Sequence, residues 1–259
     1  IIHELGTVDP LRDIEIINAE LILADHAALE KRKTSREKKA RSGDKEAKKE
    51  LALMEKLLPH LDAGKPAITA QINDDEKDIM KEFFLLTSKR TIFACNVSED
   101  ELANALDSPD AHPMVSKVKS YAHETHGAEA IVISARIEEE LIDLSSEEAN
   151  EFLQDMGITD SGVSTMIRSV YQLLGLSTYL TTGEKETRAW TIKSGAKAPE
   201  AAGVIHTDFE RGFIAAEVLH YDDYVEFQSK SAARDAGKLR IEGKEYLVND
   251  GDVIEFRFN

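Results

Sequence analysis

Two short groups of polar residues have the side chains needed to recognise a ligand by hydrogen bonds. The tetrad 96–99 (NVSE) and the triad 134–136 (SAR) each follow directly on a short apolar run. The amide of Asn96 can donate and accept hydrogen bonds, whereas the carboxylate of Glu99 only accepts them. If the two groups meet in space, they can bind one polar molecule between them.

The two apolar runs that precede these groups predict the elements that position them. Residues 91–95 (TIFAC) and 130–133 (AIVI) are short and continuous, as expected of parallel strands buried on both faces. Residues 115–123 (VSKVKSYAH) have helical apolar spacing and fit a crossover helix between the strands. In open α/β sheets the ligand lies beyond the carboxyl ends of the strands, where both polar groups would sit.

Two motifs resemble nucleotide-binding motifs of P-loop GTPases. Asn-x-x-Glu, after the first strand, resembles the fourth motif, Asn-Lys-x-Asp, and Ser-Ala, after the second strand, resembles the fifth, Ser-Ala-Lys. This sequence departs from them, because Glu99 is one methylene longer than Asp and Val97 replaces the lysine. A well-placed Asp accepts from two donors of guanine, whereas adenine presents an acceptor there. The departures resemble the YchF-type Obg-like ATPases, which prefer ATP. Taken alone, Asn96 also fits a turn residue at a strand end. The resemblance assigns the nucleotide base to Asn96, Val97, Glu99, Ser134, Ala135 and Arg136.

No Gly-x-x-x-x-Gly-Lys-Ser/Thr motif occurs in the 259 residues, so a phosphate-binding loop is missing from this sequence. The resemblance places that loop upstream of Ile1, and residues 1–10 fit the end of a strand and a loop already under way. It implies that ATP is bound with Mg²⁺, held mainly by those upstream motifs. We therefore assign no catalytic residue and no metal ligand to this chain, and expect it to be inactive by itself.

Composition indicates a soluble globular protein with ordinary cores. Hydrophobic residues make up 42% of the chain, and the single cysteine, Cys95, excludes an internal disulfide. Its place in an apolar run favours inert packing over a reactive thiol. The sequence has no Cys/His metal cluster, no apolar run long enough for a membrane span and no secretory signal. We expect a cytoplasmic protein that does not contact a membrane.

The apolar residues of 11–61 recur at helical spacing, which predicts an antiparallel helical hairpin with its turn near Gly43. The expected apolar seam consists of Ile14, Ile17, Leu21, Ala24 and Ala28 on the first helix and Leu51, Met54, Leu58 and Leu61 on the second. The hairpin resembles the coiled-coil insertion of the same family, whose members associate with ribosomes.

The far end of this hairpin is strongly basic, with a formal charge of +7 in a chain of −17. Such segregation favours an anionic partner, and RNA of the large ribosomal subunit is the partner that the resemblance implies. Because the basic end has no aromatic residue, recognition of particular bases is not expected. The predicted RNA-binding residues are Lys31, Arg32, Lys33, Arg36, Lys38, Lys39, Arg41, Lys45, Lys48 and Lys49.

Further helices are predicted at 75–86, capped by Asn73 or Asp74, and at 137–144, 148–156 and 161–174. Ser145 with Glu148 forms a capping pattern for the third of these. The acidic triplet 138–140 could suggest a metal or acid/base site. Consecutive carboxylates point around a helix, however, so we interpret the triplet as a solvated face.

The last third of the chain predicts a small α+β domain. Short β-rich runs at 178–182, 187–193, 213–219, 239–241 and 253–258 surround one helix-compatible segment, 199–205. The stretches 202–213 (AGVIHTDFERGF) and 248–254 (VNDGDVI) resemble a TGS domain, a ubiquitin-like β-grasp module that would bind RNA or ribosomal protein through its sheet face. His206 and Asp208 are expected to cap a helix end and scaffold a turn rather than to catalyse.

The predicted fold is therefore α/β: a partial P-loop NTPase, Rossmann-like domain (1–10 and 65–145) interrupted by a helical coiled-coil hairpin (11–64). Linker helices (146–174) and a β-grasp TGS domain (175–259) follow. The predicted function is that of a ribosome-associated, ATP-binding and ATP-hydrolysing Obg-like NTPase. Two alternatives stay open: a non-catalytic RNA- or ribosome-binding adaptor, and a switch that binds GTP rather than ATP.

Overall fold

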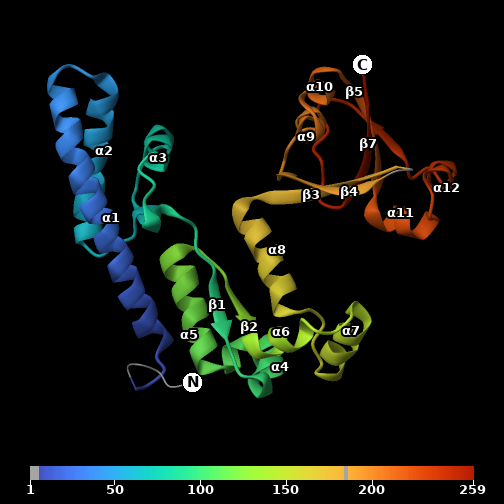
Figure 1. Ribbon diagram of the computed structural model, residues 1–259, viewed down its shortest axis with the longest axis horizontal. Coiled ribbons are helices and arrows are strands. Elements are labelled where there is room, and N and C mark those ends of the chain that lie inside the picture. Colours follow the sequence, from blue (N-terminus) through green and yellow to red (C-terminus); the bar gives the residue numbers. More distant parts are fainter. Residues whose placement is uncertain (1–5, 184–185) are drawn as a thin grey trace. The chain divides into compact units, whose positions relative to one another are not determined.

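The computed structural model describes residues 6–183 and 186–259 (Figure 1). The chain divides into two compact units, Ile1–Met166 and Ile167–Asn259. The first five residues, which belong to the predicted strand end and loop at 1–10, lie outside the described residues.

The first unit begins with a helical hairpin. Helix α1 (Pro10–Arg41) starts at the N-cap Asp9, and helix α2 (Lys45–Asp62) starts at Asp44, whose carboxylate accepts from two backbone amides of the first turn. Gly43 occupies the turn with φ +96°, a backbone conformation that disfavours any residue with a Cβ. The predicted hairpin and its turn are thus present.

The predicted seam is right on α2, but of its positions on α1 only Ile14 and Leu21 are even half-buried. Met54, Leu58 and Leu61 are buried, and Leu51 packs against them. On α1, however, Ile17, Ala24 and Ala28 are exposed. The buried positions of α1 are instead Ile22, Asp25 and Leu29. A different face of α1 is therefore buried from the one predicted. The buried face includes the carboxylate of Asp25, and a prediction from apolar residues alone does not take such a residue into account.

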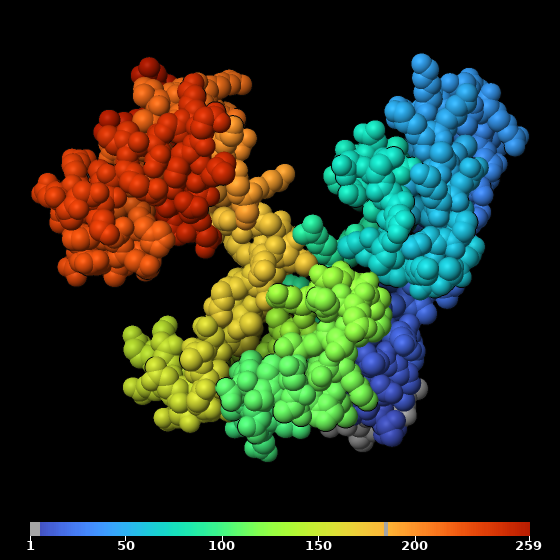
Figure 2. All heavy atoms as spheres, turned by 180° about the vertical axis from the view of Figure 1, so that it is seen from behind, coloured from blue at the N-terminus to red at the C-terminus, as the bar shows by residue number. Residues whose placement is uncertain are grey.

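Between the hairpin and the first strand lie a 3₁₀ turn (Ala67–Thr69), helix α3 (Asp74–Lys81) and a second 3₁₀ turn (Leu86–Ser88). Asn73 caps α3 and forms a capping box with Glu76. The helix packs beside α2, and in the space-filling view the two join in one continuous surface (Figure 2). The predicted helix 75–86 is too long, since it ends near Lys81 and Phe84 adopts a left-handed φ of +54°.

Strands β1 (Phe93–Asn96) and β2 (Ala130–Ile133) are parallel neighbours, with Asn96 opposite Ile133. Both predicted strands exist, but β1 is not buried on both faces, because it alternates half-buried and exposed residues in a two-stranded sheet. The connection contains the predicted crossover helix, α5 (Pro113–Tyr121), extended by a π-helical turn at Ala122–His126. It also contains α4 (Glu99–Asp107), which the sequence analysis missed.

Three helices follow β2. Helix α6 (Ala135–Leu141) starts earlier than predicted, and α7 (Ser146–Asp155) has the predicted capping box of Ser145 with Glu148. Helix α8 (Gly162–Leu174) contains the division between the two units. Buried side chains of α4, α5, β2, α6 and α7 form one core, which includes Leu102, Val115, Val132, Ile137 and Leu153. This core fixes the ends of β1 and β2 relative to α4 and α6.

The second unit is built on a mixed five-stranded sheet in the order β4-β3-β7-β5-β6. Its strands are β3 (Leu176–Thr182), β4 (Thr187–Lys193), β5 (Phe213–His220), β6 (Arg240–Glu242) and β7 (Asp252–Phe258). The strands β3 and β7 are parallel, and the other neighbours are antiparallel. All five predicted strands are therefore present, with ends shifted by a few residues.

Helices cover both faces of this sheet. The predicted helix, α9 (Ala198–Ile205), packs on one face through Ala201 and Ala202 against Ile254 and Phe256. Three further helices were not predicted: α10 (Thr207–Arg211), α11 (Tyr221–Phe227) and α12 (Lys230–Asp235). Of these, α11 and α12 pack on the opposite face, where Ala233 meets Leu219 and Val253. Among the described residues, no helix is both long and apolar enough to span a membrane.

Candidate nucleotide-base site and basic hairpin

The fold brings the two predicted recognition groups together at the carboxyl ends of β1 and β2. Asn96 is the last residue of β1, and its Oδ1 accepts a hydrogen bond from the backbone N–H of Ala135 at 2.9 Å. Ala135 is the first residue of α6, so this contact also satisfies one amide of that helix start. Asn96 is left with its side-chain NH₂, which can donate to a ligand.

Val97 and Ser134 line the same junction in different ways. The backbone N–H of Val97 donates to the carbonyl of Ile133 at 2.9 Å, which continues the strand pairing by one residue. Ser134 is 1% exposed, and its hydroxyl has no hydrogen-bond partner among the described residues. A buried hydroxyl without a partner is costly, so Ser134 offers an unused donor and acceptor next to Asn96.

Glu99 and Arg136 point toward solvent rather than toward each other. Glu99 is exposed at the first position of α4, where the helix N-terminus favours a carboxylate. The side chain of Arg136 forms ion pairs with Glu139 at 3.4 Å and Glu140 at 2.9 Å on its own helix. The guanidinium group of Arg136 is therefore engaged along α6, and only its backbone lies at the strand ends.

A cavity of about 1170 Å³ opens beside β1. Its lining includes Asn96 and Val97, together with the start of α1 and residues of α4 and α5. Glu99 and residues 134–136 do not belong to it. The cavity therefore shares only Asn96 and Val97 with the predicted base site. Cys95 lines it as well, and burial raises the pKa of its thiol, as expected for a packing residue.

The donor set at this junction does not fit a metal ion. In the part of the chain that the structure describes, no group of three or more His, Cys, Asp or Glu side chains could hold one. Within the acidic triplet, Glu138 accepts from the backbone N–H of Gly162 at 2.6 Å, while Glu139 and Glu140 pair with Arg136. Glu138 thus joins α6 to the start of α8, and the other two carboxylates stay within α6. No step of nucleotide chemistry is assigned to Mg²⁺ in this chain.

The basic end of the hairpin divides into cations that hold the fold and cations that face solvent. Arg32 Nε and Arg36 Nε lie 3.0 and 2.8 Å from Oε2 of Glu50, a buried carboxylate on α2. Arg32 also donates to the carbonyl of Glu82 at 2.8 Å and lies over the ring of Phe83. Reversing the charge of Arg32 would therefore break contacts that hold the hairpin, and not only alter a binding surface.

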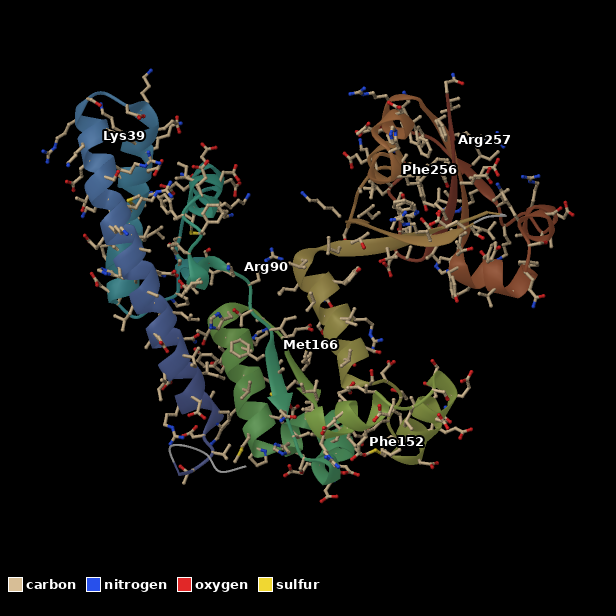
Figure 3. The ribbon with its side chains drawn as sticks, in the orientation of Figure 1. Lys39, Arg90, Phe152, Met166, Phe256 and Arg257 are labelled. Atoms are coloured by element: carbon tan, nitrogen blue, oxygen red, sulfur yellow. The ribbon has the colours of Figure 1, made fainter. Side chains whose placement is uncertain are left out.

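The other cations of the segment are better placed to meet a partner. Lys39 projects from the end of the hairpin into solvent (Figure 3). The exposed lysines and arginine are Lys31, Lys38, Lys39, Arg41, Lys45, Lys48 and Lys49, while Lys33 is half-buried. Among them, Lys49 pairs with Glu46 and Arg41 lies 4.0 Å from Glu37, both at the surface, where such pairs are weak.

Glu50 is a residue that the sequence analysis missed. It falls on the apolar stripe of α2, between Ala47 and Met54, both of which are buried. A single carboxylate on an otherwise apolar stripe indicates a buried ion pair, and two arginines on the facing helix were available to form it. That signal could have separated Arg32 and Arg36 from the other cations of the segment.

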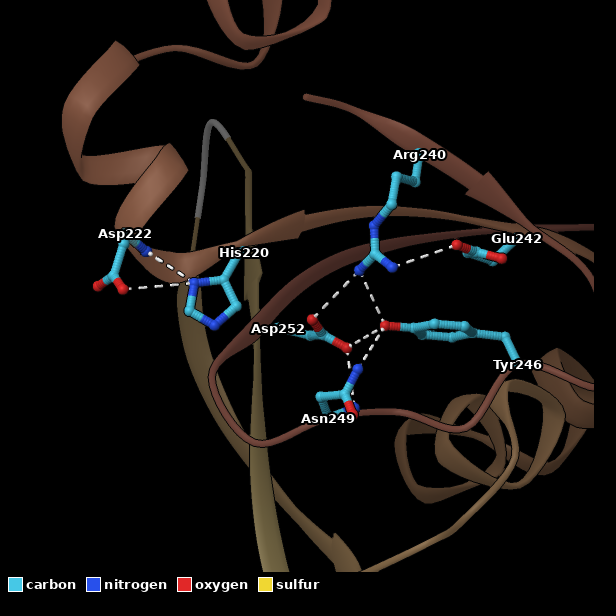
Figure 4. Close-up of polar contacts among 7 residues, drawn as sticks. All are labelled: His220, Asp222, Arg240, Glu242, Tyr246, Asn249 and Asp252. Carbon is cyan, nitrogen blue, oxygen red and sulfur yellow. Dashed lines mark hydrogen bonds and ion pairs between the residues drawn. The ribbon is translucent and has the colours of Figure 1, made fainter. Parts of the chain in front are cut away.

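In the second unit, the His-Thr-Asp segment has the predicted capping role. Nδ1 of His206 accepts from the backbone N–H of Asp208 at 3.2 Å, at the start of α10. The aspartate of the Gly-Asp-Val segment, Asp252, is buried. It accepts hydrogen bonds from Tyr246 Oη at 2.7 Å and from the Asn249 N–H at 2.9 Å (Figure 4). Arg240 donates to Tyr246 at 3.0 Å. These residues fix the loop before β7.

The sheet face opposite α9 contains a second buried ion cluster. Glu217 on β5 is 4% exposed and pairs with Lys230 of α12 and Arg257 of β7. Lys230 holds the pKa of this carboxyl below its usual range, and Arg257 acts in the same direction. The predicted binding surface on this face is therefore partly covered, because α11 and α12 are packed and ion-paired onto it.

Comparison with known proteins gives consistent matches. The family YchF-GTPase_C, described as a protein of unknown function (DUF933), matches residues 176–259. Over 259 residues the chain is 48% identical to the ribosome-binding ATPase YchF of Bacillus subtilis, covering all of this chain and 69% of that protein. It is 40% identical to Obg-like ATPase 1 of Gallus gallus, over all of this chain and 65% of that protein. The solved structure of the Schizosaccharomyces pombe YchF GTPase matches with a TM-score of 0.78 and 35% identity, over 99% of this chain and 68% of that one.

Proposed function

This chain belongs to the YchF family, and from this premise we propose that it binds ATP at the ends of β1 and β2 and associates with the ribosome through its basic hairpin. The observation that carries the first half is the 2.9 Å hydrogen bond between Asn96 Oδ1 and the Ala135 N–H. It joins the two motifs at one point, as a base-recognition site requires. Relatives named as ribosome-binding ATPases support the second half.

Base recognition follows from the groups that remain free at this junction. The NH₂ of Asn96 donates to a ring nitrogen of the purine, since its oxygen is occupied by Ala135. The backbone of residues 135–136 lines the base, and the hydroxyl of Ser134 adds a donor or acceptor after a small shift. Glu99 accepts from the exocyclic amine of adenine. With its longer side chain, Glu99 does not hold its carboxylate where an Asp would meet the two donors of guanine.

Competition between ATP and GTP tests the base site in the complete gene product. We expect calorimetry to show tighter binding of ATP, and we expect Asn96→Ala to weaken both nucleotides by about tenfold, which corresponds to about 1.4 kcal/mol. Glu99→Asp is the matched variant, and it should move the preference toward GTP. Binding of GTP more than about tenfold tighter than ATP by the unmodified protein would contradict this assignment.

The hairpin is proposed to dock on RNA of the large ribosomal subunit. Its segment 31–49 carries a formal charge of +7, so the rest of the chain carries −24 and repels phosphate. RNA can then approach in one orientation only, against the exposed cations of the hairpin. The described residues of 175–259, which we assign to a β-grasp TGS domain, would supply a second contact and raise affinity through linkage.

We further assign residues 1–10 and 65–145 to the nucleotide domain, 11–64 to a coiled-coil insertion and 146–174 to linker helices. The charge segregation also favours a second candidate function, a ribosome-binding adaptor in which nucleotide is only a switch. The two differ in one measurement. In an adaptor, ribosomes would not change the rate of ATP turnover by the complete gene product, whereas in a ribosome-associated ATPase they would.

A further inference from the structure

The turn between α3 and the 3₁₀ segment at Leu86–Ser88 displays an aromatic ring to solvent beside the hairpin. Phe84 is 82% exposed, although the preceding residue, Phe83, is buried in the hairpin core. Phe84 also has φ +54°, a left-handed conformation that is disfavoured for a bulky side chain. Exposure and backbone strain at one large apolar residue are both unfavourable, and they occur together at functional contacts.

Contacts on both sides of Phe84 hold this turn against α1. On one side, Arg32 donates to the carbonyl of Glu82 at 2.8 Å and covers the ring of Phe83. On the other side, Oδ1 of Asp25 accepts from the N–H of Leu86 at 2.7 Å. The turn is therefore tied to two points of α1, seven residues apart in sequence. Phe84 lies between these two anchored points, so less conformational entropy of this turn is lost when a ligand binds.

The charge around this ring suits a nucleic acid. Lys31 is exposed next to Arg32, and the exposed cations of the hairpin continue from there to the turn at Gly43. That turn lies about 17 Å further along α1, from a rise of about 1.5 Å per residue. Three carboxylates of α3 pair with lysines, whereas Asp75 and Glu82 are exposed acidic residues of the same segment. The pairs are Asp74 with Lys77, Glu76 with Lys56, and Asp78 with Lys81.

From this arrangement we propose that Phe84 stacks on an unpaired base of RNA whose phosphates lie along the exposed lysines of the hairpin. A ring beside a cationic track is the arrangement by which proteins bind single strands with little sequence preference. The inference rests on the proposed docking of the hairpin on RNA. It adds a specific contact that the sequence of segment 31–49 does not contain, because the fold brings Phe84 to it from elsewhere in the chain.

Three substitutions separate stacking from other roles of this residue. Phe84→Asn removes the ring and suits the left-handed backbone, so it should not lower stability. Phe84→Leu keeps apolar surface but has no π-face. Phe84→Trp keeps the π-face. The probes are a labelled 12-nucleotide oligouridine, which has little stacking of its own, and an abasic oligomer of the same length and charge, both followed by fluorescence anisotropy.

We expect Phe84→Asn and Phe84→Leu to weaken oligouridine binding by about five- to 100-fold, and Phe84→Trp to retain it. The abasic oligomer should bind weakly to all four proteins alike. If Phe84→Leu binds oligouridine like the unmodified protein, the aromatic face does not contribute to RNA binding and the proposal is overturned. Equal binding by Phe84→Asn would also overturn it.

The same assay separates this inference from the proposed function. Charge reversal of Lys38, Lys39 and Lys45 removes cations at the far end of the hairpin and leaves the turn at Phe84 unchanged. If that variant loses binding while Phe84→Asn does not, the hairpin docks on RNA and only the stacking contact is wrong. If neither variant changes binding, RNA docking by the hairpin is wrong as well.

Discussion

The carboxylate of Asp25 lies 2.7 Å from both the backbone nitrogen and the hydroxyl oxygen of Thr87, and accepts a hydrogen bond from each. Its other oxygen accepts from the N–H of Leu86 at 2.7 Å. The Thr87 hydroxyl in turn accepts from the N–H of Ala67 at 2.9 Å. One buried carboxylate on α1 thus joins the hairpin to the segment that leads into β1.

Asp25→Ala is expected to destabilise the first unit by about 3 kcal/mol, because it leaves the N–H of Leu86 and the buried N–H and hydroxyl of Thr87 without their acceptor. The measurement is urea unfolding followed by circular dichroism. Glu20→Ala is the matched control, since Glu20 is an exposed acidic residue on the same helix, and it should change stability by less than about 0.5 kcal/mol. Equal effects of the two substitutions would show that Asp25 does not hold the hairpin.

Charge reversal of Lys38, Lys39 and Lys45 should weaken co-sedimentation with ribosomes and flatten its salt dependence. Each lost phosphate contact removes slightly less than one unit from the slope of log K against log salt, so about two to three units should disappear. Reversal of Lys65, Lys117 and Lys244, which are exposed elsewhere, is the control of equal charge. If both triple variants behave alike, net charge rather than the hairpin determines binding.

Arg32 is excluded from that test for a physical reason. Replacing it with Glu would place two carboxylates together at the buried Glu50 and remove the contact with the Glu82 carbonyl. Breaking a buried pair in this way costs about 3 to 5 kcal/mol, so a loss of ribosome binding would report unfolding.

The 259-residue chain by itself is expected neither to hydrolyse ATP nor to bind it with micromolar affinity. Its sequence contains base-recognition residues but no phosphate-binding loop, whose backbone amides supply most of the affinity for a nucleotide. Calorimetry and a phosphate-release assay measure the two properties. Micromolar binding or steady turnover by this chain would show that other residues cradle the phosphates.

Unfolding of the second unit should become easier at alkaline pH through Tyr179. This side chain is fully buried, donates to the carbonyl of Ala201 at 2.9 Å, and has its pKa raised by burial. The folded chain therefore favours the neutral phenol. Its contribution to stability is complete below about pH 10, the pKa of an exposed tyrosine, and is lost as pH rises above it.

Tyr179→Phe checks the sign of this effect. The variant should lose about 1 kcal/mol at neutral pH, because the hydrogen bond to Ala201 is gone. Above pH 10 the free energy of unfolding of the unmodified chain should fall more steeply, by up to about 1.4 kcal/mol per pH unit, until the two curves meet. Parallel curves would exclude Tyr179 as the titrating group.

The elements that the sequence predicted well are those in which apolar spacing alone decides the structure. The strands of both units and the seam of α2 belong to this class. The capping of α7 was also predicted, from the polar pair Ser145 and Glu148. Prediction was wrong where a polar residue occupies a buried position on an otherwise apolar helix face. Asp25 rotates the buried face of α1, and Glu50 withdraws Arg32 and Arg36 from the basic surface.

The candidate site was predicted as a set of residues but not as a geometry. Strand ends and motif spacing placed Asn96 and Ser134 at one sheet edge, and the structure joins Asn96 to Ala135. The side-chain direction of Arg136 could not be predicted, because it depends on ion pairs with Glu139 and Glu140 that compete with any ligand. The short helices α10 to α12 contain too few residues for a periodic pattern to appear.

The hydrogen bonds of Asp25 to Thr87 span 62 residues of sequence, whereas α1 and α2 meet across a turn of three residues at 42–44. Contacts between near neighbours in sequence close small loops and form early in folding, and contacts across long loops form later. The hairpin should therefore assemble first and the turn at Phe84 should lock onto it afterwards. A folding chain would pass through a stage that presents its lysines to RNA before the aromatic ring is in position, and would bind then by charge alone.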